Sequence, residues 1–308
     1  MKVSLTGGLG NQLFQLAFSL FQSSGQNVTL ISNLGKPRKN SLGLPEIASY
    51  KLPKNVFLET EDVANKLSRK TAGYLLRSGI EAQGIEKLKV YKSVTRILGT
   101  LVLLKQSKSL LPVIASQNIG FDEILVKSKG SIYLGYFQTY FWMIEHEVEI
   151  LMHNLKLINE SRIIKYLESA RRVKPIVVHV RLGDYIHETK FGIPSKNYYE
   201  KAIEFQVRLN KESPIWLFSN DIQSAKEYIP ERFRDRLVIV DNVGLDSAEI
   251  LEIMRNGIGY VIGNSTFSWW AAQLSNTNEA VVCAPKPWFK EIQTPKLLIP
   301  DKWIEIDA

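Results

Sequence analysis

The carboxyl-terminal half of the chain repeats one pattern, in which short apolar runs alternate with longer segments that carry apolar residues at helical spacing. The runs are rich in Ile, Val and Leu and lack the polar alternation of a half-exposed strand, so they predict strands that are buried on both faces. Strands that alternate with helices are typical of a parallel α/β sheet. The predicted strands cover residues 176–180, 215–219, 237–240, 260–263 and 280–284.

The amino-terminal part begins with the same order of elements. Residues 2–6 and 27–32 predict strands, and the helix between them follows a glycine-containing turn and ends near Gly25. Residues 131–135 predict a further strand that leads into an aromatic turn, whose side chains are more typical of a core than of a binding site. Residues 33–130 give only a weak pattern of mixed helices and loops.

We therefore predict an α/β fold with two Rossmann-like domains, residues 1–157 and residues 158–308. A chain of 308 residues is long enough for two domains, and its 45% hydrophobic and 23% charged residues are ordinary for a soluble enzyme. No apolar run is long enough to span a membrane. The single cysteine, Cys283, permits no intrachain disulfide, which suits a reducing cytoplasm, and its apolar neighbours predict a buried side chain.

The net charge of +8 suggests an anionic partner, which could be nucleic acid, anionic lipid or a phosphorylated substrate. The Lys and Arg residues are scattered and form no nucleic-acid-binding motif, so we expect no nucleic-acid partner. Much of the excess lies in residues 66–108, around the apolar run 97–104. Two interpretations fit this segment: a helix packed in the core with a solvated basic face, which we favour, and a peripheral contact with an anionic membrane.

Polar side chains gather where the strands of the second domain end. His179 and Arg181 point to one face of their strand, because side chains alternate, and Gly183 allows a sharp turn before Asp184. Parallel strands end at one edge of their sheet, so the polar residues after successive strands together predict a nucleotide-sized site. The later strands are followed by Asn220 and Asp221, by Asp241 and Asn242, and by Asn264, Ser265 and Thr266.

Two segments carry residue types that bind phosphate. Asn264, Ser265 and Thr266 stand where a strand gives way to a helix, and hydroxyl and free N–H groups at a helix start bind phosphate. The alternative is that Ser265 serves only as an N-cap. Arg181, across from this helix start, would complete a clamp for a diphosphate. The glycine loop before the first helix either presents N–H groups to an anion or forms a plain tight turn.

The chain has no metal-ligand pattern, because it lacks an Asp-x-Asp triplet and its histidines are dispersed. We therefore expect neither a metal nor another cofactor. If a diphosphate leaves during the reaction, its charge would be met by Arg181 and helix N-termini. Two alternatives from other functional classes are a nucleotide-dependent oxidoreductase and a glycan-binding module. The glycine spacing after the first strand, and the lack of an acidic residue at the end of the second strand, disfavour the oxidoreductase.

Five short segments, spread over nearly the whole chain, carry a family resemblance. They are GGLGNQLFQ (7–15), GYFQTYF (135–141), HVRLGDY (179–185), FSND (218–221) and NSTFSWWAA (264–272). These segments resemble the motifs of the bacterial α-1,2-fucosyltransferases. The resemblance implies a GT-B type α/β fold, with two Rossmann-like domains facing each other across a cleft, the acceptor side in residues 1–157 and the donor side in residues 158–308. It also implies an inverting, metal-independent transfer of L-fucose from GDP-β-L-fucose to the 2-hydroxyl of a galactoside, in the synthesis of O-antigen or a related surface glycan.

From this resemblance we expect Arg181, Asp184 and His179 to be the catalytic residues. Arg181 would neutralise the departing diphosphate, and His179 would orient the sugar or a phosphate. Asp184 would act as the general base, or would instead hold Arg181 or the loop. The residues expected to bind the donor, with Asn220 or Asp221 at the guanine or the ribose, are Gly10, Asn11, Asn220, Asp221, Asn264, Ser265, Thr266 and Phe267.

One position departs from the family pattern. Leu182 stands where the motif H-x-R-R-G-D-Y usually has a second Arg, which we expect to remove a positive charge near the diphosphate site. A related donor such as GDP-colitose is therefore an alternative to GDP-fucose. The expected partners are the GDP-sugar and a galactose-containing glycan, free or lipid-linked. The expected location is the cytoplasm, with the inner face of the membrane as an option.

Overall fold

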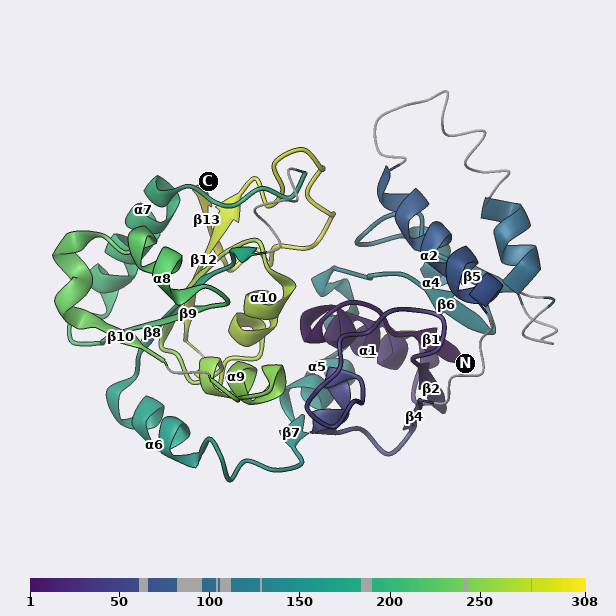
Figure 1. The fold of residues 1–308 in the computed structure, drawn as a ribbon, viewed down its shortest axis with the longest axis horizontal. Helices are drawn as coiled ribbons and strands as arrows, with labels where there is room; N and C mark the ends of the chain where they lie inside the picture. The colour runs from purple at the N-terminus through teal and green to yellow at the C-terminus, as the bar shows by residue number, and fades with distance from the viewer. Residues whose placement is uncertain are drawn as a thin grey trace. The chain divides into compact units, whose positions relative to one another are not determined.

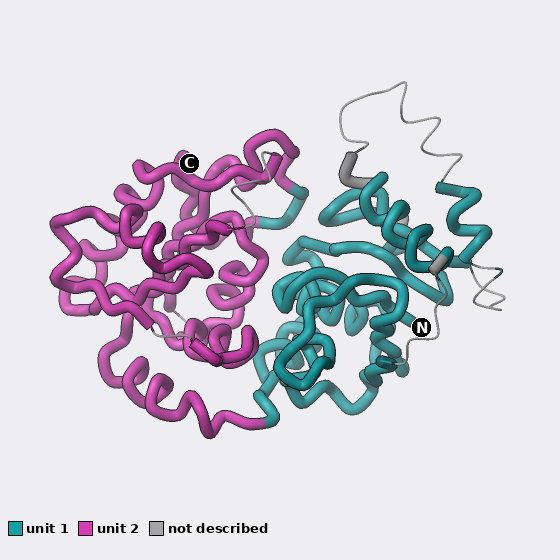
Figure 2. Tube along the Cα trace, in the orientation of Figure 1, with its two compact units in different colours: residues 1–158, 295–298 teal, residues 159–294, 299–308 magenta. Residues whose placement is uncertain are grey.

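The computed structural model describes residues 1–60, 66–81, 96–103, 105, 112–127, 129–183, 190–240, 243–277 and 279–308. These residues form two compact units (Figure 2). Unit 1 holds Met1–Ile158 together with Pro295–Leu298, and unit 2 holds Asn159–Thr294 together with Ile299–Ala308. The assignment of an acceptor side and a donor side to these parts of the chain stays a prediction.

Unit 1 is built on a five-stranded sheet in which all the strands are parallel (Figure 1). Its order is β4-β2-β1-β6-β5, so β1 and β6 are neighbours although they are far apart in the sequence. β4 and β5 lie within residues 33–130, for which mixed helices and loops were predicted, and that prediction was wrong there. Both are short strands at the edges of the sheet, with too few residues to show a pattern. The strands are β1 (Lys2–Ser4), β2 (Val28–Ile31), β4 (Val56–Glu59), β5 (Val113–Ala115) and β6 (Ile132–Leu134).

Helix α1 (Leu9–Ser23) lies at the centre of unit 1, and most of its side chains are buried. Phe18 stacks on Phe137 with the ring centroids 4.0 Å apart and meets Trp142 edge to face. The aromatic turn after β6 therefore belongs to the core, as predicted. Further elements of unit 1 are η1 (Glu46–Ser49), α2 (Lys66–Glu81), a helical segment at 96–103, α4 (Glu123–Lys127), η2 (Tyr140–Met143), α5 (His146–His153), and the antiparallel pair β3 (Tyr50–Lys51) and β7 (Lys156–Leu157).

Unit 2 is built on a six-stranded parallel sheet of order β10-β9-β8-β11-β12-β13. The chain runs outward from β8 to one edge of the sheet and then from β11 to the other edge, which is the arrangement of a Rossmann fold. The two units thus confirm the predicted α/β fold class with two Rossmann-like sheets. The strands are β8 (Ile176–Val180), β9 (Ile215–Ser219), β10 (Leu237–Ile239), β11 (Gly259–Ile262), β12 (Val281–Lys286) and β13 (Ile304–Asp307).

The last strand, β13, was not predicted. It pairs only with β12, where Ile304 lies opposite Cys283, so it is an edge strand of the sheet. Its residues alternate between half-buried and exposed, which leaves too few apolar positions to indicate a buried strand. Cys283 itself is fully buried, as predicted, and burial raises the pKa of its thiol to about 11.

Helices cover both faces of the unit 2 sheet. α7 (Lys196–Leu209) contacts β8, β11, β12 and β13, and Val178 and Val180 of β8 lie in the core beneath it. α10 (Thr266–Gln273) packs on β11, and its Trp269 and Trp270 are fully buried. Further helices are α6 (Ile164–Val173), α8 (Ile222–Ala225), η4 (Lys226–Tyr228), η5 (Glu231–Arg236) and α9 (Ser247–Met254), which begins at a capping box of Asp246 with Glu249.

Candidate active site

The candidate site lies at the carboxyl ends of β8 and β11, the neighbouring strands from which the unit 2 sheet is wound in opposite directions. His179 of β8 lies opposite Ile262 of β11, so the residues that follow them leave the sheet side by side. A Cβ atom added to Gly263 would lie 3.5 Å from the His179 carbonyl oxygen and 3.9 Å from the Arg181 nitrogen. The backbone at Arg181 is therefore next to the start of the NSTFSWW segment, as predicted. This switch point is where open α/β sheets bind ligands.

His179 is buried behind this edge. Its side chain is 4% exposed, and its ring lies 5.9 Å from the ring of Phe267 in α10. Burial, with the charge of Arg181, lowers the pKa of His179 to about 3. The imidazole is therefore neutral near pH 7. None of the residues that the structure describes hydrogen-bonds its Nδ1 atom, which is buried.

The Leu182 side chain points into the core of unit 2 and not toward the candidate site. Its side chain is 2% exposed and packs in the core beneath α7, with Val178 and Val180. His179, in contrast, faces Phe267 of α10 on the other side of the sheet. The expectation that Leu182 removes a positive charge near the diphosphate was therefore wrong, because position 182 continues the core face of β8.

Asn220 shapes the turn that follows β8. Its Oδ1 atom accepts a hydrogen bond of 2.9 Å from the Leu182 N–H group. Gly183 has φ +60°, and a Cβ atom there would overlap the Asn220 amide nitrogen. The predicted donor residue Asn220 is thus a brace that joins the ends of β8 and β9. Asp184, the predicted base, lies outside the described residues, as do Asp241 and Asn242.

Asp221 is the N-cap of α8. Its carboxylate accepts hydrogen bonds from the Ser224 N–H group, at 3.2 Å, and from the Ser224 hydroxyl, at 2.7 Å. These bonds lower the pKa of Asp221 from its usual value. The carboxylate is therefore charged at neutral pH and stands at the edge of the sheet after β9. Its contact with guanine or ribose stays a prediction.

The NSTFSWW segment divides its roles among successive residues. The Asn264 Nδ2 atom donates to the carbonyl oxygens of Phe191, at 3.0 Å, and Gly192, at 2.9 Å. Asn264 thereby holds the loop before α7 against the end of β11. Ser265 is the N-cap of α10, because its Oγ atom accepts from the Phe267 N–H group at 3.4 Å. Thr266 and Phe267 begin the helix and are only half-buried, so their side chains remain accessible.

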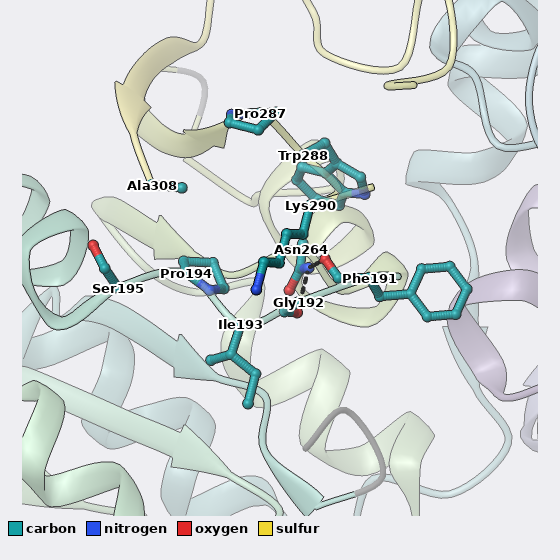
Figure 3. A pocket seen from close by; sticks show the side chains of 10 residues that line it. All are labelled: Phe191, Gly192, Ile193, Pro194, Ser195, Asn264, Pro287, Trp288, Lys290 and Ala308. Atoms are coloured by element: carbon teal, nitrogen blue, oxygen red, sulfur yellow. Dashed lines mark hydrogen bonds between the residues drawn. The ribbon is translucent and has the colours of Figure 1, made fainter. Parts of the chain in front are cut away.

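A cavity of about 440 Å³ adjoins this edge of unit 2 (Figure 3). Asn264 is the one residue that the cavity shares with the predicted site residues within the described chain. In Figure 3, Lys290 and Asn264 lie at its centre, whereas the Phe191 ring points away. The sequence reasoning missed Trp288 and Lys290, and the only signal was the aromatic pair in PKPWFK. The full lining is Phe191, Gly192, Ile193, Pro194, Ser195, Asn264, Pro287, Trp288, Lys290 and Ala308.

The remaining predicted residues, Gly10 and Asn11, belong to unit 1. Asn11 uses its Oδ1 atom to accept a hydrogen bond of 3.0 Å from Nε2 of Gln138, which joins the 7–15 and 135–141 motifs. Gln15 is fully buried, accepts from the Thr6 N–H group at 3.0 Å and donates to the Gly135 carbonyl oxygen at 2.9 Å. The two motifs are thus joined where β1 and β6 end, at the switch point of the unit 1 sheet.

The N-terminus of α1 already holds a carboxylate of this chain. Glu46 is 4% exposed and accepts from the Leu9 N–H group at 2.5 Å, and the Asn11 N–H group bonds the Gly8 carbonyl oxygen. A buried anion at a helix N-terminus is favoured by the helix dipole. Of the two interpretations of the glycine loop, these contacts favour the tight turn. Gly10 is buried in the first turn of the helix, and donor binding by Gly10 and Asn11 stays a prediction.

The described residues also bear on the expectations about metal binding and membrane spans. They contain no group of three or more His, Cys, Asp or Glu side chains that could hold a metal ion. Their helices include none whose length and apolar character would allow it to cross a membrane.

Comparisons with known proteins agree with the motifs. A family model described as Glycosyl transferase family 11 matches residues 123–305. An α-1,2-colitosyltransferase of Escherichia coli is 25% identical over 311 residues, which cover 98% of this chain and 97% of that protein. The O-antigen biosynthesis glycosyltransferase WbnK of Escherichia coli is 32% identical over 159 residues, covering 49% of this chain and 51% of that protein. The crystal structure of fucosyltransferase NodZ from Bradyrhizobium has a TM-score of 0.45 and 15% identity, covering 88% of this chain and 91% of that chain.

The family match spans more than half of the chain and includes the switch point of unit 2, with Arg181 and the NSTFSWW segment. The resemblance that the motifs carried is therefore confirmed: the chain belongs to glycosyl transferase family 11, and it is a glycosyltransferase.

Proposed function

We propose that this glycosyltransferase moves L-fucose from GDP-β-L-fucose to the 2-hydroxyl of a galactoside, with inversion at the sugar carbon. The proposal includes a role in the synthesis of O-antigen or a related surface glycan. It is supported by the membership in family 11, by the fucosyltransferase motifs, and by a relative named for O-antigen biosynthesis. The acceptor would be a galactose-containing glycan, free or lipid-linked, used in the cytoplasm.

One observation carries the proposal: the backbone at Arg181 lies next to Gly263, three residues before α10 begins, at the switch point of unit 2. A guanidinium group forks toward two phosphate oxygens, and a helix N-terminus offers N–H groups and a partial positive charge. Thr266 adds a half-buried hydroxyl at the same helix start. These groups suit a diphosphate, which is the part of a GDP-sugar that leaves with negative charge.

The reaction would be one displacement. The acceptor oxygen attacks the anomeric carbon, and the bond from that carbon to the phosphate oxygen breaks. The electron pair of the breaking bond goes to the diphosphate, where Arg181 and the start of α10 stabilise the developing charge. The proton of the acceptor hydroxyl goes to a base, for which we propose Asp184. No metal or other cofactor is proposed, so these groups alone meet the charge of the leaving GDP.

His179 would orient the donor without exchanging protons. With a pKa of about 3, its imidazole neither donates a proton nor adds a positive charge at neutral pH. Its buried Nδ1 atom can still form one hydrogen bond with a sugar hydroxyl or a phosphate oxygen. We therefore propose His179 as a group that fixes the donor against Arg181.

GDP-colitose is a second candidate donor, because the α-1,2-colitosyltransferase of Escherichia coli aligns with nearly the full length of this chain. Colitose is fucose without its 3-hydroxyl group, so one oxygen atom separates the two donors. The phosphate clamp would hold both, because it contacts the shared GDP part. Discrimination between them would depend on side chains around the sugar ring.

The deciding experiment is a transfer assay with purified protein, a panel of galactosides and either GDP-fucose or GDP-colitose, read by mass spectrometry. We expect a fucosylated product that an α-1,2-specific fucosidase cleaves, and equal yield when a chelator is present. Transfer only from GDP-colitose would select the second donor. Binding of glycan with no release of GDP would favour the glycan-binding alternative and end the proposal.

Two substitutions test the assigned roles. Arg181→Ala should abolish transfer and weaken GDP binding in calorimetry, whereas Arg208→Ala, which removes an exposed arginine of α7, should change neither. Asp184→Asn should lower turnover by about 10²–10⁴-fold if Asp184 is the base. Near-normal transfer by Arg181→Ala would refute the role of Arg181 in binding the diphosphate. A loss of turnover of less than tenfold for Asp184→Asn would refute the role of Asp184 as the general base.

A further inference from the structure

Unit 1 carries an apolar face that faces solvent. In the helical segment 96–103, the side chains of Ile97, Leu98, Leu101 and Val102 are 59%, 57%, 53% and 36% exposed. The favoured interpretation of this run, a helix whose apolar side packs in the core, was therefore wrong for these positions. Leu104 and residues 82–95 and 106–108 of the same basic stretch lie outside the described residues.

The opposite face of this segment is firmly anchored. The Arg96 guanidinium donates to the carbonyl oxygens of Leu75, Ala115 and Ser116, at 2.7, 3.0 and 2.7 Å. It also donates to the Ser78 hydroxyl at 2.6 Å. These bonds tie the segment to α2 and to the end of β5. Figure 1 shows α2 and this segment beside β5 and β6.

Packing supports the same orientation. Leu103 is 2% exposed and belongs to the core cluster that includes Leu75. A Cβ atom on Gly99 would lie 3.2 Å from Leu75 and 3.3 Å from Thr71, so a glycine lets the segment approach α2 closely. Because one face is fixed in this way, the exposed positions lie on its opposite, outward side.

The neighbouring helix extends the apolar face and adds positive charge. Leu67 and Tyr74 of α2 are 57% and 37% exposed. Arg69, Lys70, Arg77 and Lys105 are exposed as well. Residues 66–80 and 96–105 contain no Asp or Glu in their sequence. We name this surface the apolar–basic face: Leu67, Lys70, Tyr74, Arg77, Ile97, Leu98, Leu101, Val102 and Lys105.

We propose that the apolar–basic face docks unit 1 on an anionic phospholipid bilayer. Exposed patches of clustered apolar side chains mark interaction sites, and the exposed charged residues named for this face are all cations. Apolar side chains can enter the headgroup boundary while Lys and Arg bind anionic headgroups. A second copy of the chain would bring the same cations against each other, and a nucleic acid would leave the aliphatic side chains unused. A lipid surface satisfies both kinds of residue.

The test is flotation of the full-length protein with vesicles of phosphatidylcholine, alone or mixed with phosphatidylglycerol. We expect binding to the mixed vesicles that falls as salt is raised, and little binding to phosphatidylcholine alone. Leu98→Gln with Leu101→Gln should lower partitioning by roughly tenfold or more. Lys70→Gln with Lys105→Gln should lower partitioning by roughly 25-fold, about fivefold for each cation.

Matched controls change exposed residues elsewhere. Leu42→Gln in unit 1 and Val243→Gln in unit 2 replace side chains that are 79% and 87% exposed, and neither should alter partitioning. The proposal is overturned if the protein ignores the mixed vesicles, or if Leu98→Gln with Leu101→Gln partitions like Leu42→Gln. It is also overturned if that variant turns a dimer into a monomer without changing lipid binding, because the face would then join two copies. Flotation needs no sugar donor, so its outcome is independent of the transferase proposal.

Discussion

The turn after β8 offers a sharp test, because one glycine and one asparagine share it. Gly183→Ala places a Cβ atom at φ +60°, where an L-residue costs about 1–2 kcal/mol relative to the right-handed region. The same Cβ atom displaces the Asn220 amide and with it the bond to the Leu182 N–H group, which adds roughly 1 kcal/mol. Alanine also lowers the conformational entropy of the unfolded chain, which raises the free energy of unfolding by about 0.4–1 kcal/mol. The expected net loss is roughly 2 kcal/mol.

A double-mutant cycle separates these contributions. In an Asn220→Ala background the collision and the hydrogen bond are both absent, so Gly183→Ala should cost only about 0.5–1 kcal/mol, the backbone strain less the entropic return. The coupling between positions 183 and 220 should therefore be about 1–1.5 kcal/mol. Gly244→Ala is the matched control, because Gly244 has φ +76° and only the end of the Arg162 side chain lies near its Cβ position.

Urea unfolding followed by tryptophan fluorescence measures these losses, because every tryptophan except Trp142 lies in unit 2. Transfer activity measured in parallel should fall for Gly183→Ala, since Arg181 stands two residues earlier in the same turn. Equal costs of Gly183→Ala in the two backgrounds would refute the proposed brace. If Gly183→Ala in the unmodified chain costs no more than Gly244→Ala, the proposed collision between the new Cβ atom and the Asn220 amide is refuted.

Three further substitutions test other contacts. His179→Gln should make the free energy of unfolding less dependent on acid. The folded-state pKa of about 3 lies below the ordinary value of 6.5, so the wild type is most stable above pH 6.5 and loses stability as the pH falls toward 3. An equal loss of unfolding free energy in wild type and variant between pH 7 and pH 4.5 would contradict this. Leu182→Arg should destabilise unit 2 by several kcal/mol in urea unfolding without tightening GDP binding in calorimetry. The control Leu182→Met should cost less than about 1.5 kcal/mol. Tighter GDP binding by the Leu182→Arg variant would show that position 182 faces the site. Gln15→Leu leaves the Thr6 N–H group and the Gly135 carbonyl oxygen without their buried partner. It should lower the free energy of unfolding, followed by circular dichroism, by about 2–4 kcal/mol. An equal effect of Gln22→Leu, on the same helix, would argue against the two Gln15 hydrogen bonds as the cause.

The central strand of unit 2 shows how far side-chain alternation leads. Alternation predicted that His179 and Arg181 share one face of β8. His179 lies against Phe267 of α10, and the charge of Arg181 contributes to the lowered pKa of its imidazole. The same alternation puts Leu182 on the face of Val178 and Val180, where it is buried. The expectation about a missing charge failed because it relied on the family motif, while the parity of position 182 already indicated the core.

Contacts between distant parts of the chain were beyond the reach of sequence patterns. Asn220 bonds Leu182 across 38 residues, and Asn264 bonds Phe191 across 73 residues. An asparagine after a strand has the same local pattern whether it binds a ligand or holds a loop, so only the folded chain separates the two roles. The short edge strands β4 and β13 were not predicted for a related reason. Each is stabilised as a strand by pairing with one neighbouring strand, and that pairing leaves no pattern in its own sequence.

The amides of the motifs do similar work in the two units. Gln12 donates to the Gly7 and Arg38 carbonyl oxygens and accepts from Ile47 in unit 1, just as Asn264 ties the loop before α7 in unit 2. Side chains whose polar atoms are engaged with the backbone set the position of their neighbours and have less capacity left for a substrate. Replacing such a brace should therefore change stability and rate together, whereas replacing Arg181, whose guanidinium we assign to the diphosphate, should weaken GDP binding together with the rate. That contrast separates the residues that build the strand-end turns from the one that meets the leaving group.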